Sequence, residues 1–353
     1  MIKIVKKIGF CLFCVVILIT AAFTILFFNE INSLSSLRIV DNYPMYQMKY
    51  CGDYGFDEFL KVGAENDSDI EKFVTRKLLK GLPIDLGINK AGCTAFKVKN
   101  EKGEVLLCRN FDFDYAPSLQ IKTEPKDGFK SISTVNLTFA GYSKGNLPKE
   151  GVKMKNFLTL ASPYLPFDGM NENGVAMALL AVPEVNVKDD KDKVKLNTTT
   201  AIRLVLDKAK NVDEAVELLK KYNIYFSADV YCHYIIADAE GNSVIVEYWD
   251  GKLQTIKSVK DYQIASNFIS YNNLNIGEGG SEFDRYNTVE KVINDNNGVL
   301  TQKQAEKLLM DVGCYNSKGE NKLQWSVIYN LTTRTGEIFA YRNNKNVINF
   351  ELK

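Results

Sequence analysis

Hydrophobic and polar positions follow two different patterns on either side of residue 92. Residues 57–80 alternate charged and apolar positions at helical spacing, which predicts a helical segment. Pro83, Gly87 and Gly92 then interrupt the pattern. Because glycine and proline break regular structure, this stretch marks the boundary at which the helical segment ends.

From Cys93 onward, short apolar runs bounded by turn residues predict strands. The first two are 93–99 and 104–112, around a turn at 100–103. The Asp-Gly pair at 250–251 is a strong hairpin signal, and residues 168–174 form a polar turn cluster. Further strands are expected at 131–139, 157–161, 175–182, 231–238, 243–248, 252–256, 262–267, 325–331 and 337–342.

Helices are expected between these groups of strands. Two follow each other at 198–210 and 212–222, the second with Asn211 as its cap. Ser281 can cap another helix that runs to about residue 294, and Thr301 with Gln304 forms a capping box for a last one. Blocks of strands separated by paired helices predict an α+β fold, in which two packed sheets have helices on the outside.

The N-terminus has the pattern of a membrane anchor. Residues 1–7 contain three lysines, residues 8–28 contain no charged side chain, and Glu30 follows. Such a run spans a bilayer core of about 30 Å. The lysines predict a cytoplasmic stub at 1–7, a transmembrane helix at 8–28 and an extracellular body. A cleaved signal peptide and a secreted protein are the alternative, although the apolar part of signal peptides is normally shorter.

Composition and charge exclude several functions. The chain is 46% hydrophobic and 25% charged with a net charge of +1, so no nucleic-acid partner is expected. It contains one histidine, His233, which lies in an apolar strand run where a packed side chain is the ordinary role. A metal site of the HExxH type is therefore excluded, and no metal or organic cofactor is expected. A hydrolase with this composition needs a base other than histidine.

Cysteine supplies a candidate nucleophile. Of seven cysteines, five lie beyond the N-terminal apolar run, an odd number that predicts a free thiol outside the cell. A thiol whose own α-amine acts as base is one known arrangement, because that amine has a pKa of about 7.7–8.0. Cys93 follows the boundary at Gly92, so a cut between these two residues would create such an N-terminus.

The first hairpin brings charged residues toward Cys93. A turn centred near residue 102 places Cys93 opposite residues 109–112, which include Arg109 and Asp112. An arginine near a thiol favours the thiolate. Arg109 and Asp112 have opposite parity, so both reach Cys93 only if the strand ends or bulges there.

Several motifs together resemble one known family. Residues 91–96 read A-G-C-T-A-F and residues 108–113 read C-R-N-F-D-F, which resembles the start of the mature chain in the choloylglycine hydrolase and penicillin V acylase family. Further similar stretches occur in the family's order: the D-G-x-N-E-x-G turn at 168–174, the hairpin at 234–247, Asn267 after a strand, Arg285 in a helix, and the strand at 325–331. The resemblance covers 93–353.

The resemblance implies an N-terminal-nucleophile hydrolase, an αββα sandwich. By this resemblance, Cys93 would attack an amide carbonyl and form a thioester. Arg109 and Asp112 would flank it, with Asp112 holding the α-amine. The side-chain amide of Asn267 and a backbone N–H near Ala181 would stabilise the oxyanion.

Arg285 would complete the polar cluster. Position 181 is alanine, whereas family members often carry a polar or aromatic residue there. The backbone N–H of residue 181 can still act as a donor, but side-chain contacts to the substrate would differ. Residues 29–92 are longer than the leaders of bile-salt hydrolases and resemble the pro-segments of isopenicillin N acyltransferase and acid ceramidase-like relatives. Self-cleavage between Gly92 and Cys93 is expected, with 93–353 as the catalytic domain.

The expected reaction is hydrolysis of linear C–N amides in N-acylated small molecules of the bile-salt, penicillin V or N-acyl amino acid type. Its partners would be that small molecule and the membrane, and a homo-oligomer is compatible with the sequence. Three alternatives stay open. They are an acyltransferase, a non-catalytic membrane-tethered protein, and a papain-like enzyme that pairs His233 with Cys93 or Cys232.

Overall fold

The computed structural model of the chain describes residues 10, 12–15, 17, 18, 21, 22, 24–81, 83, 84 and 92–352. Within them, two β-sheets face each other. The nine-stranded sheet has the order β1 (Arg38–Asp41), β2 (Met45–Lys49), β5 (Ser118–Thr123), β6 (Ser131–Asn136), β7 (Pro166–Asn171), β8 (Ala176–Ala181), β11 (Cys232–Ala237), β12 (Ser243–Trp249) and β13 (Lys252–Ile256).

The six-stranded sheet carries Cys93. Its order is β14 (Gln263–Ala265), β3 (Gly92–Lys99), β4 (Val105–Asp112), β15 (Leu323–Asn330), β16 (Thr335–Ala340) and β17 (Ile348–Glu351). The two sheets meet where β3 packs on β8 and β11. A small parallel pair, β9 (Lys195–Asn197) and β10 (Asn223–Tyr225), lies apart from both.

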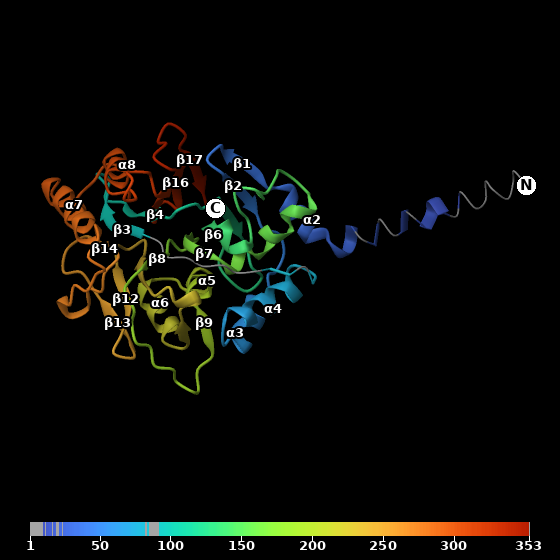
Figure 1. Cartoon of the computed structure of the whole chain (residues 1–353), viewed down its shortest axis with the longest axis horizontal. Coiled ribbons are helices and arrows are strands. Elements are labelled where there is room, and N and C mark those ends of the chain that lie inside the picture. Colours follow the sequence, from blue (N-terminus) through green and yellow to red (C-terminus); the bar gives the residue numbers. More distant parts are fainter. Residues whose placement is uncertain are drawn as a thin grey trace, which may run out of the picture.

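Helices cover the outer faces, which completes four layers (Figure 1). Helices α5 (Thr198–Lys208) and α6 (Val212–Leu219) pack on the nine-stranded sheet, and α7 (Glu282–Asp295) and α8 (Gln302–Asp311) pack on the six-stranded sheet. A separate apolar core joins α7 and α8 to the outer face of β3, β4 and β15. The expected α+β sandwich with outer helices is confirmed.

Local capping signals explain where most of these helices begin. Asn211 accepts a hydrogen bond from the backbone N–H of Glu214, and Thr301 forms the expected box with Gln304. The cap expected at Ser281 is wrong, because its side chain makes no capping hydrogen bond. The Ser281 hydroxyl instead accepts a hydrogen bond from Arg285.

The first hairpin has the register that the sequence predicts. Lys99 pairs with Val105 at the turn, and Cys93 pairs with Phe111 at the far end. Gly103 adopts a φ of 77°, and its N–H closes the turn onto the carbonyl of Asn100. The β3–β4 hairpin therefore places Cys93 at the end of a strand in the six-stranded sheet.

The chain before Cys93 is built into the same fold (Figure 1). Strand β2 pairs in parallel with β5, so β1 and β2 extend the nine-stranded sheet. Helix α2 (Phe28–Ser35) packs on the 3₁₀ helix Met154–Tyr164. Helices α3 (Phe56–Val62) and α4 (Asp67–Lys77) place Phe56, Phe59 and Phe73 around the ring of Tyr164. Residues preceding Cys93 thus supply part of the hydrophobic core.

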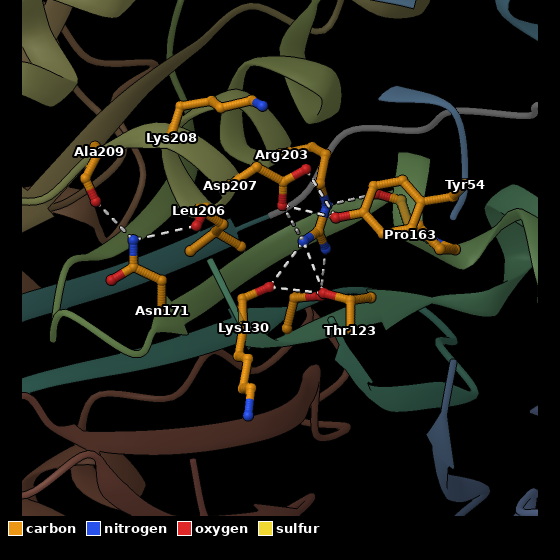
Figure 2. Close-up of polar contacts among 12 residues, drawn as sticks. Tyr54, Thr123, Lys130, Pro163, Asn171, Arg203, Leu206, Asp207, Lys208 and Ala209 are labelled. Carbon is orange, nitrogen blue, oxygen red and sulfur yellow. Dashed lines mark hydrogen bonds and ion pairs between the residues drawn. The ribbon is translucent and has the colours of Figure 1, made fainter. Parts of the chain in front are cut away.

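A buried polar junction adds to this attachment (Figure 2). The hydroxyl of Tyr54 donates a hydrogen bond of 2.7 Å to Asp207 on α5, and Arg203 pairs with Asp207 at 3.1 Å. Arg203 also donates to Thr123 at 3.1 Å. Burial raises the pKa of Asp207 to about 6, although Arg203 and Tyr54 oppose the shift. The junction therefore joins the segment before Cys93 to α5 and β5.

The structure corrects several boundaries. The strand expected at 157–161 is wrong, because Met154–Tyr164 is a 3₁₀ helix in which the Thr159 hydroxyl bonds back to the Asn156 carbonyl. The strand expected at 131–139 ends at Asn136, whose side chain accepts from the Thr138 N–H and starts a 3₁₀ turn. The helix expected at 57–80 is two helices, α3 and α4.

The expected stub at 1–7 and positions 8, 9, 11, 16, 19, 20 and 23 of the expected anchor lie outside the described residues. Residues 85–91, which precede the expected cut, also lie outside them. Among the residues that are described, no helix combines the length and the apolar character needed to cross a bilayer.

Candidate active site

Cys93 lies fully buried on β3, with a different partner for each of its polar groups. Its Sγ is 3.5 Å from a guanidinium nitrogen of Arg109. Its backbone N–H donates a 2.8 Å hydrogen bond to Oδ1 of Asn267. Its carbonyl accepts a hydrogen bond from Arg285. Three of the residues expected around Cys93 are therefore in direct contact with it.

Arg109 is anchored by a residue that we did not expect in the site. It forms a fully buried ion pair with Asp168 on β7, and it also donates to the carbonyl of Leu179. Asp168 further accepts hydrogen bonds from Trp325 at 3.0 Å and Tyr329 at 2.6 Å. The sequence pointed to Asp168 only as the start of a turn motif. The structure places it inside β7, facing the six-stranded sheet.

Asn267 connects Cys93 to two other expected residues. Its Oδ1 accepts from both the Cys93 N–H and Arg285, at 2.8 and 2.7 Å. Because arginine can only donate, the atom that faces Arg285 must be the oxygen. The nitrogen of the same amide donates to the Ala181 carbonyl at 2.7 Å. One N–H of the Asn267 amide is therefore committed to Ala181, and the other remains for a ligand.

Arg285 links the start of α7 to the start of β3. Besides the carbonyl of Cys93, it donates to the hydroxyl of Thr94 at 2.6 Å. Its Nε lies 3.3 Å from the hydroxyl of Ser281, one helical turn earlier. This arrangement explains why Ser281 does not cap α7. It also holds the Cys93 backbone in one position.

Asp112 approaches Cys93 from the opposite side of the strand. It pairs with Gly92 in the hairpin, so its side chain does not share the face of Arg109 and the Cys93 thiol. Its Oδ1 accepts from the backbone N–H of Cys314 at 2.8 Å, while Oδ2 is buried without a hydrogen-bond partner among the described residues. Burial raises the pKa of this carboxyl, despite nearby Arg285. Asp112 is therefore placed beside the Gly92 backbone rather than the thiol.

Asn110, which the hairpin register also brought near Cys93, is not part of the site. Its amide donates to the Leu309 carbonyl on α8 and its oxygen accepts from Ser326. The sequence could not show which of Asn110 and Asp112 belongs to the site, because residues two apart on a strand point to the same face of the sheet. What separates them is that Asp112 lies at the strand end, where Gly92 is its partner.

Burial raises the pKa of several thiols, and Cys93 is one of them. Burial raises the pKa of Cys93, an effect that Arg109 opposes and Asp112 reinforces. Burial also raises the pKa of Cys232 to about 12. The six described cysteines are all free.

His233 is held away from the thiols. Its Nδ1 lies 3.0 Å from Glu247, which also accepts hydrogen bonds from the Ser270 and Tyr271 backbone. His233 is thus a buried strand histidine, as its apolar surroundings in the sequence indicate. Within the described residues, no cluster of three histidine, cysteine or acidic side chains could hold a metal ion.

A cavity of about 690 Å³ opens at this cluster. Gly92, Asn267 and Arg285 line its inner end, with Ala181 and Val182 from the end of β8. A small molecule in this cavity would lie against Gly92, the residue before the buried Cys93. The site contains the Cys93 thiol, the Arg109 guanidinium beside it, and a side-chain N–H of Asn267. A nucleophile, a positive charge that favours its anion, and a hydrogen-bond donor for an oxyanion are the groups that an acyl-transfer reaction uses.

Comparison with known proteins identifies the family. The model of the linear amide C–N hydrolases, choloylglycine hydrolase family, matches residues 93–273, about half of the chain. The match begins at Cys93. This protein belongs to that family.

Two further similarities concern sequence and fold. The penicillin V acylase of Pectobacterium atrosepticum is 32% identical over 111 residues, which are 28% of this chain and only 29% of that protein. Two variants of the conjugated bile acid hydrolase from Clostridium perfringens superpose with TM-scores of 0.52 and 0.51 at 16% identity, over 73% of this chain and 92% of theirs. The N-terminal-nucleophile hydrolase fold is therefore confirmed.

Proposed function

We propose that this protein hydrolyses linear C–N amide bonds of N-acylated small molecules, with Cys93 as the nucleophile. The observation that supports this most directly is the set of contacts on Cys93. Arg109 lies at the thiol, Asn267 at the backbone nitrogen and Arg285 at the carbonyl. A cavity opens at the same point. A strand cysteine with only a packing role would need partners for its backbone groups, but it would not need a buried arginine at its thiol.

The proposed maturation is cleavage of the Gly92–Cys93 peptide bond. It turns the Cys93 nitrogen, which already donates to Asn267, into an α-amine. This amine would remain beside Asn267 and within the reach of the unpartnered Asp112 oxygen on the Gly92 side. An amine with a pKa near 8 can accept the thiol proton at neutral pH.

The proposed reaction then has two balanced steps. The Cys93 sulfur bonds to the substrate carbonyl carbon while the thiol proton passes to the α-amine. The C–N bond breaks, the leaving amine takes that proton, and a thioester remains. Water then adds to the thioester, which releases the carboxylic acid and returns a proton to the thiol. Arg109 would stabilise the thiolate.

The oxyanion formed in both steps needs donors. We assign the free N–H of the Asn267 amide and the backbone N–H of Ala181 to this task. Their nearness, shown by the 2.7 Å bond from Asn267 to the Ala181 carbonyl, supports the assignment. Such donors act mainly on the charge that develops in the transition state.

Intact mass and N-terminal sequencing of the purified protein, beside Cys93→Ala, test the proposal. We expect a new N-terminus at Cys93 in the wild type and an uncut chain in the variant. An uncut wild type with full amidase activity would disprove the α-amine mechanism. Activity on penicillin V or conjugated bile acids, the compounds in the names of the similar proteins, is the first assay. Product analysis with added amines would distinguish hydrolysis from acyl transfer.

We further propose that residues 8–28 anchor the protein in the cell membrane with the body outside. The support is the uncharged run that follows the N-terminal lysines. Membrane fractionation of cells with and without protease treatment of the outside tests it. Protein that stays in the soluble fraction after cell lysis would disprove the anchor.

A further inference from the structure

A second cavity, of about 1190 Å³, adjoins the cavity at Cys93. The two cavities share Glu184, Asp229 and Tyr231 in their walls. A substrate bound at Cys93 can therefore extend past Tyr231 into the second cavity. We call this second cavity the aromatic groove, because five aromatic side chains line it: Tyr225, Phe226, Tyr231, Trp249 and Tyr271.

The aromatic groove has a negative charge that is not locally compensated. Glu184, Asp229 and Asp250 are exposed in its wall, and none of them forms an ion pair within the described part of the chain. A fourth carboxylate, Asp189, is paired with Lys195 at 2.7 Å. No lysine or arginine is among the described residues that line the groove. Walls that carry one sign of charge concentrate ligands of the opposite sign.

The two cations of the neighbouring cavity, Lys322 and Arg285, do not line the aromatic groove. Lys322 pairs with Asp114 at 2.8 Å. Arg285 is committed to Cys93, Thr94 and Asn267. Lys322 is therefore paired with a carboxylate, whereas Arg285 donates to neutral groups and keeps its positive charge at the Cys93 end. A ligand that passes from Cys93 toward Tyr231 moves away from Arg285 and toward Glu184 and Asp229.

The aromatic rings are placed to contact such a ligand. Tyr231 lies between the two cavities, and its carbonyl accepts from the Val182 N–H at 2.9 Å, which fixes it beside β8. The ring of Phe226 packs on it with centroids 5.2 Å apart. Burial raises the pKa of the Tyr231 hydroxyl, and Glu184 and Asp229 add to the shift, so both carboxylates act on this ring. Aromatic faces combined with carboxylates bind ammonium and guanidinium groups.

We infer that the substrate is an N-acyl amide that also carries a cationic group, an ammonium or a guanidinium, bound in the aromatic groove while the scissile amide lies at Cys93. The inference rests on the proposed function and names its substrate class. It disfavours the N-acyl amino acids, and equally penicillin V and conjugated bile acids, because their anionic groups would face Glu184 and Asp229 in the groove.

Two matched substrate series test the inference on the purified full-length protein. In the first, decanoyl amides of 1,4-diaminobutane, butylamine and 4-aminobutyrate differ only in the terminal charge of the leaving amine. In the second, a coumarin amine is acylated with 6-aminohexanoate, hexanoate or adipate, so that the charge lies on the acyl side. In at least one series we expect kcat/KM for the cationic member to exceed that for the anionic member by at least about tenfold. Equal or anion-favouring ratios in both series would overturn the inference.

Substitutions test whether the preference for cationic substrates arises in the aromatic groove. Glu184→Gln combined with Asp229→Asn should reduce the cation-to-anion ratio to about threefold or less, and added salt should reduce the wild-type ratio. The matched control is Asp213→Asn with Glu217→Gln, two exposed carboxylates on α6 whose removal should leave the ratio unchanged. An unchanged ratio in the Glu184 and Asp229 variant would also overturn the inference.

Binding measurements with substrate analogues that cannot be hydrolysed test the groove assignment independently of the proposed activity. Ketone analogues of the first series, in which CH₂ replaces the amide N–H, cannot be hydrolysed, and their affinity is measured by calorimetry. If no amide is hydrolysed but the cationic ketone binds at least about tenfold more tightly than the anionic one, the proposed activity fails and the groove assignment stands. Hydrolysis that Cys93→Ser abolishes, without charge preference, supports the function and contradicts the groove assignment.

Discussion

Arg109 connects Asp168 to the thiol of Cys93: one guanidinium nitrogen pairs with the Asp168 carboxylate and the other lies 3.5 Å from Sγ. All three side chains are fully buried. Asp168 comes from the nine-stranded sheet, whereas Arg109 and Cys93 belong to the six-stranded sheet. The ion pair therefore fixes the two sheets relative to each other at the point where the reaction is proposed to occur.

Asp168→Asn should lower kcat by about 10- to 100-fold, comparable to the loss of a supporting residue at a metal site. The reason is that Arg109 loses the carboxylate that orients it. A buried charge left without its partner typically costs about 3–5 kcal/mol, so thermal unfolding must be measured in parallel. Tyr329→Phe removes only one hydrogen bond to Asp168 and should cost about 1 kcal/mol. It provides a folded control with a smaller effect on kcat.

The pH profile distinguishes orientation from general destabilisation. When Asp168 is replaced by a neutral side chain, the positive charge of Arg109 acts on Cys93 without a compensating carboxylate. The acidic limb in the pH profile of kcat/KM should therefore move to lower pH. A variant that only loosens the fold would lower the rate without moving this limb. An Asp168→Asn protein with wild-type kcat and an unshifted profile would show that Asp168 does not position Arg109.

Asn267→Ala should lower kcat/KM by about 10²–10³-fold, the usual cost of one oxyanion donor. The same change removes the acceptor of the Cys93 nitrogen, so slower cleavage at Gly92 is also expected. Steady-state kinetics and the fraction of cut chain after expression measure the two effects. Asn287→Ala, an exposed asparagine on α7, is the control. Rapid, complete cleavage in Asn267→Ala would contradict the contact's role in maturation.

Asp207 makes stability depend on pH in a predictable direction. Its pKa is about 6 in the folded protein, above its ordinary value of about 3.9 when unfolded. The folded state therefore binds more protons than the unfolded state between about pH 4 and 6, and the contribution of this group to stability falls as pH rises through that range. The full change is about 3 kcal/mol.

Asp207→Asn should remove this contribution. Urea unfolding of the wild type and the variant at about pH 4.5, 5.5 and 7 measures it, and the stability difference between the two proteins should vary with pH. Asp127→Asn, which changes an exposed carboxylate, should leave the wild-type dependence intact. Parallel pH dependences of the wild type and Asp207→Asn would contradict the assignment.

Cleavage at Gly92 should leave the two fragments associated. Phe56, Phe59 and Tyr54 of the first fragment are buried against the second. Both fragments should elute together in size-exclusion chromatography and separate only in denaturant. Phe59→Ala typically costs about 3–5 kcal/mol and should weaken this association. Val62→Ala, on the exposed side of α3, is the control. Separation of wild-type fragments in native buffer would disprove the prediction.

Sequence patterns predicted the features that depend on neighbouring residues. The β3–β4 register, the cap at Asn211 and the box at Thr301 all result from local spacing, and the structure confirms them. Cys93 and Arg109 could be paired in the same way, because a tight turn connects their strands. The short distance along the chain between these partners made their contacts predictable.

Contacts between distant segments could not be predicted. Asp168 and Tyr54 each sit in a polar stretch that reads as turn or linker, and only the packing of the sheets shows that both are buried. The 3₁₀ helix Met154–Tyr164 has apolar residues that fit a strand equally well, and the Asn156 side chain bonds locally to the Lys149 N–H instead. The opposite faces of Asp112 and Arg109 were predictable from their parity, and the pairing of Asp112 with Gly92 confirms them.

The placement of β1 and β2 in the nine-stranded sheet has a consequence for how the protein is made. One continuous chain can refold by itself after denaturation, because all its strands stay covalently connected. After a cut at Gly92, refolding would require two separate polypeptides to find each other, and its yield would fall on dilution. The mature enzyme would therefore be a product of a single folding event, with a lifetime set by its rate of unfolding.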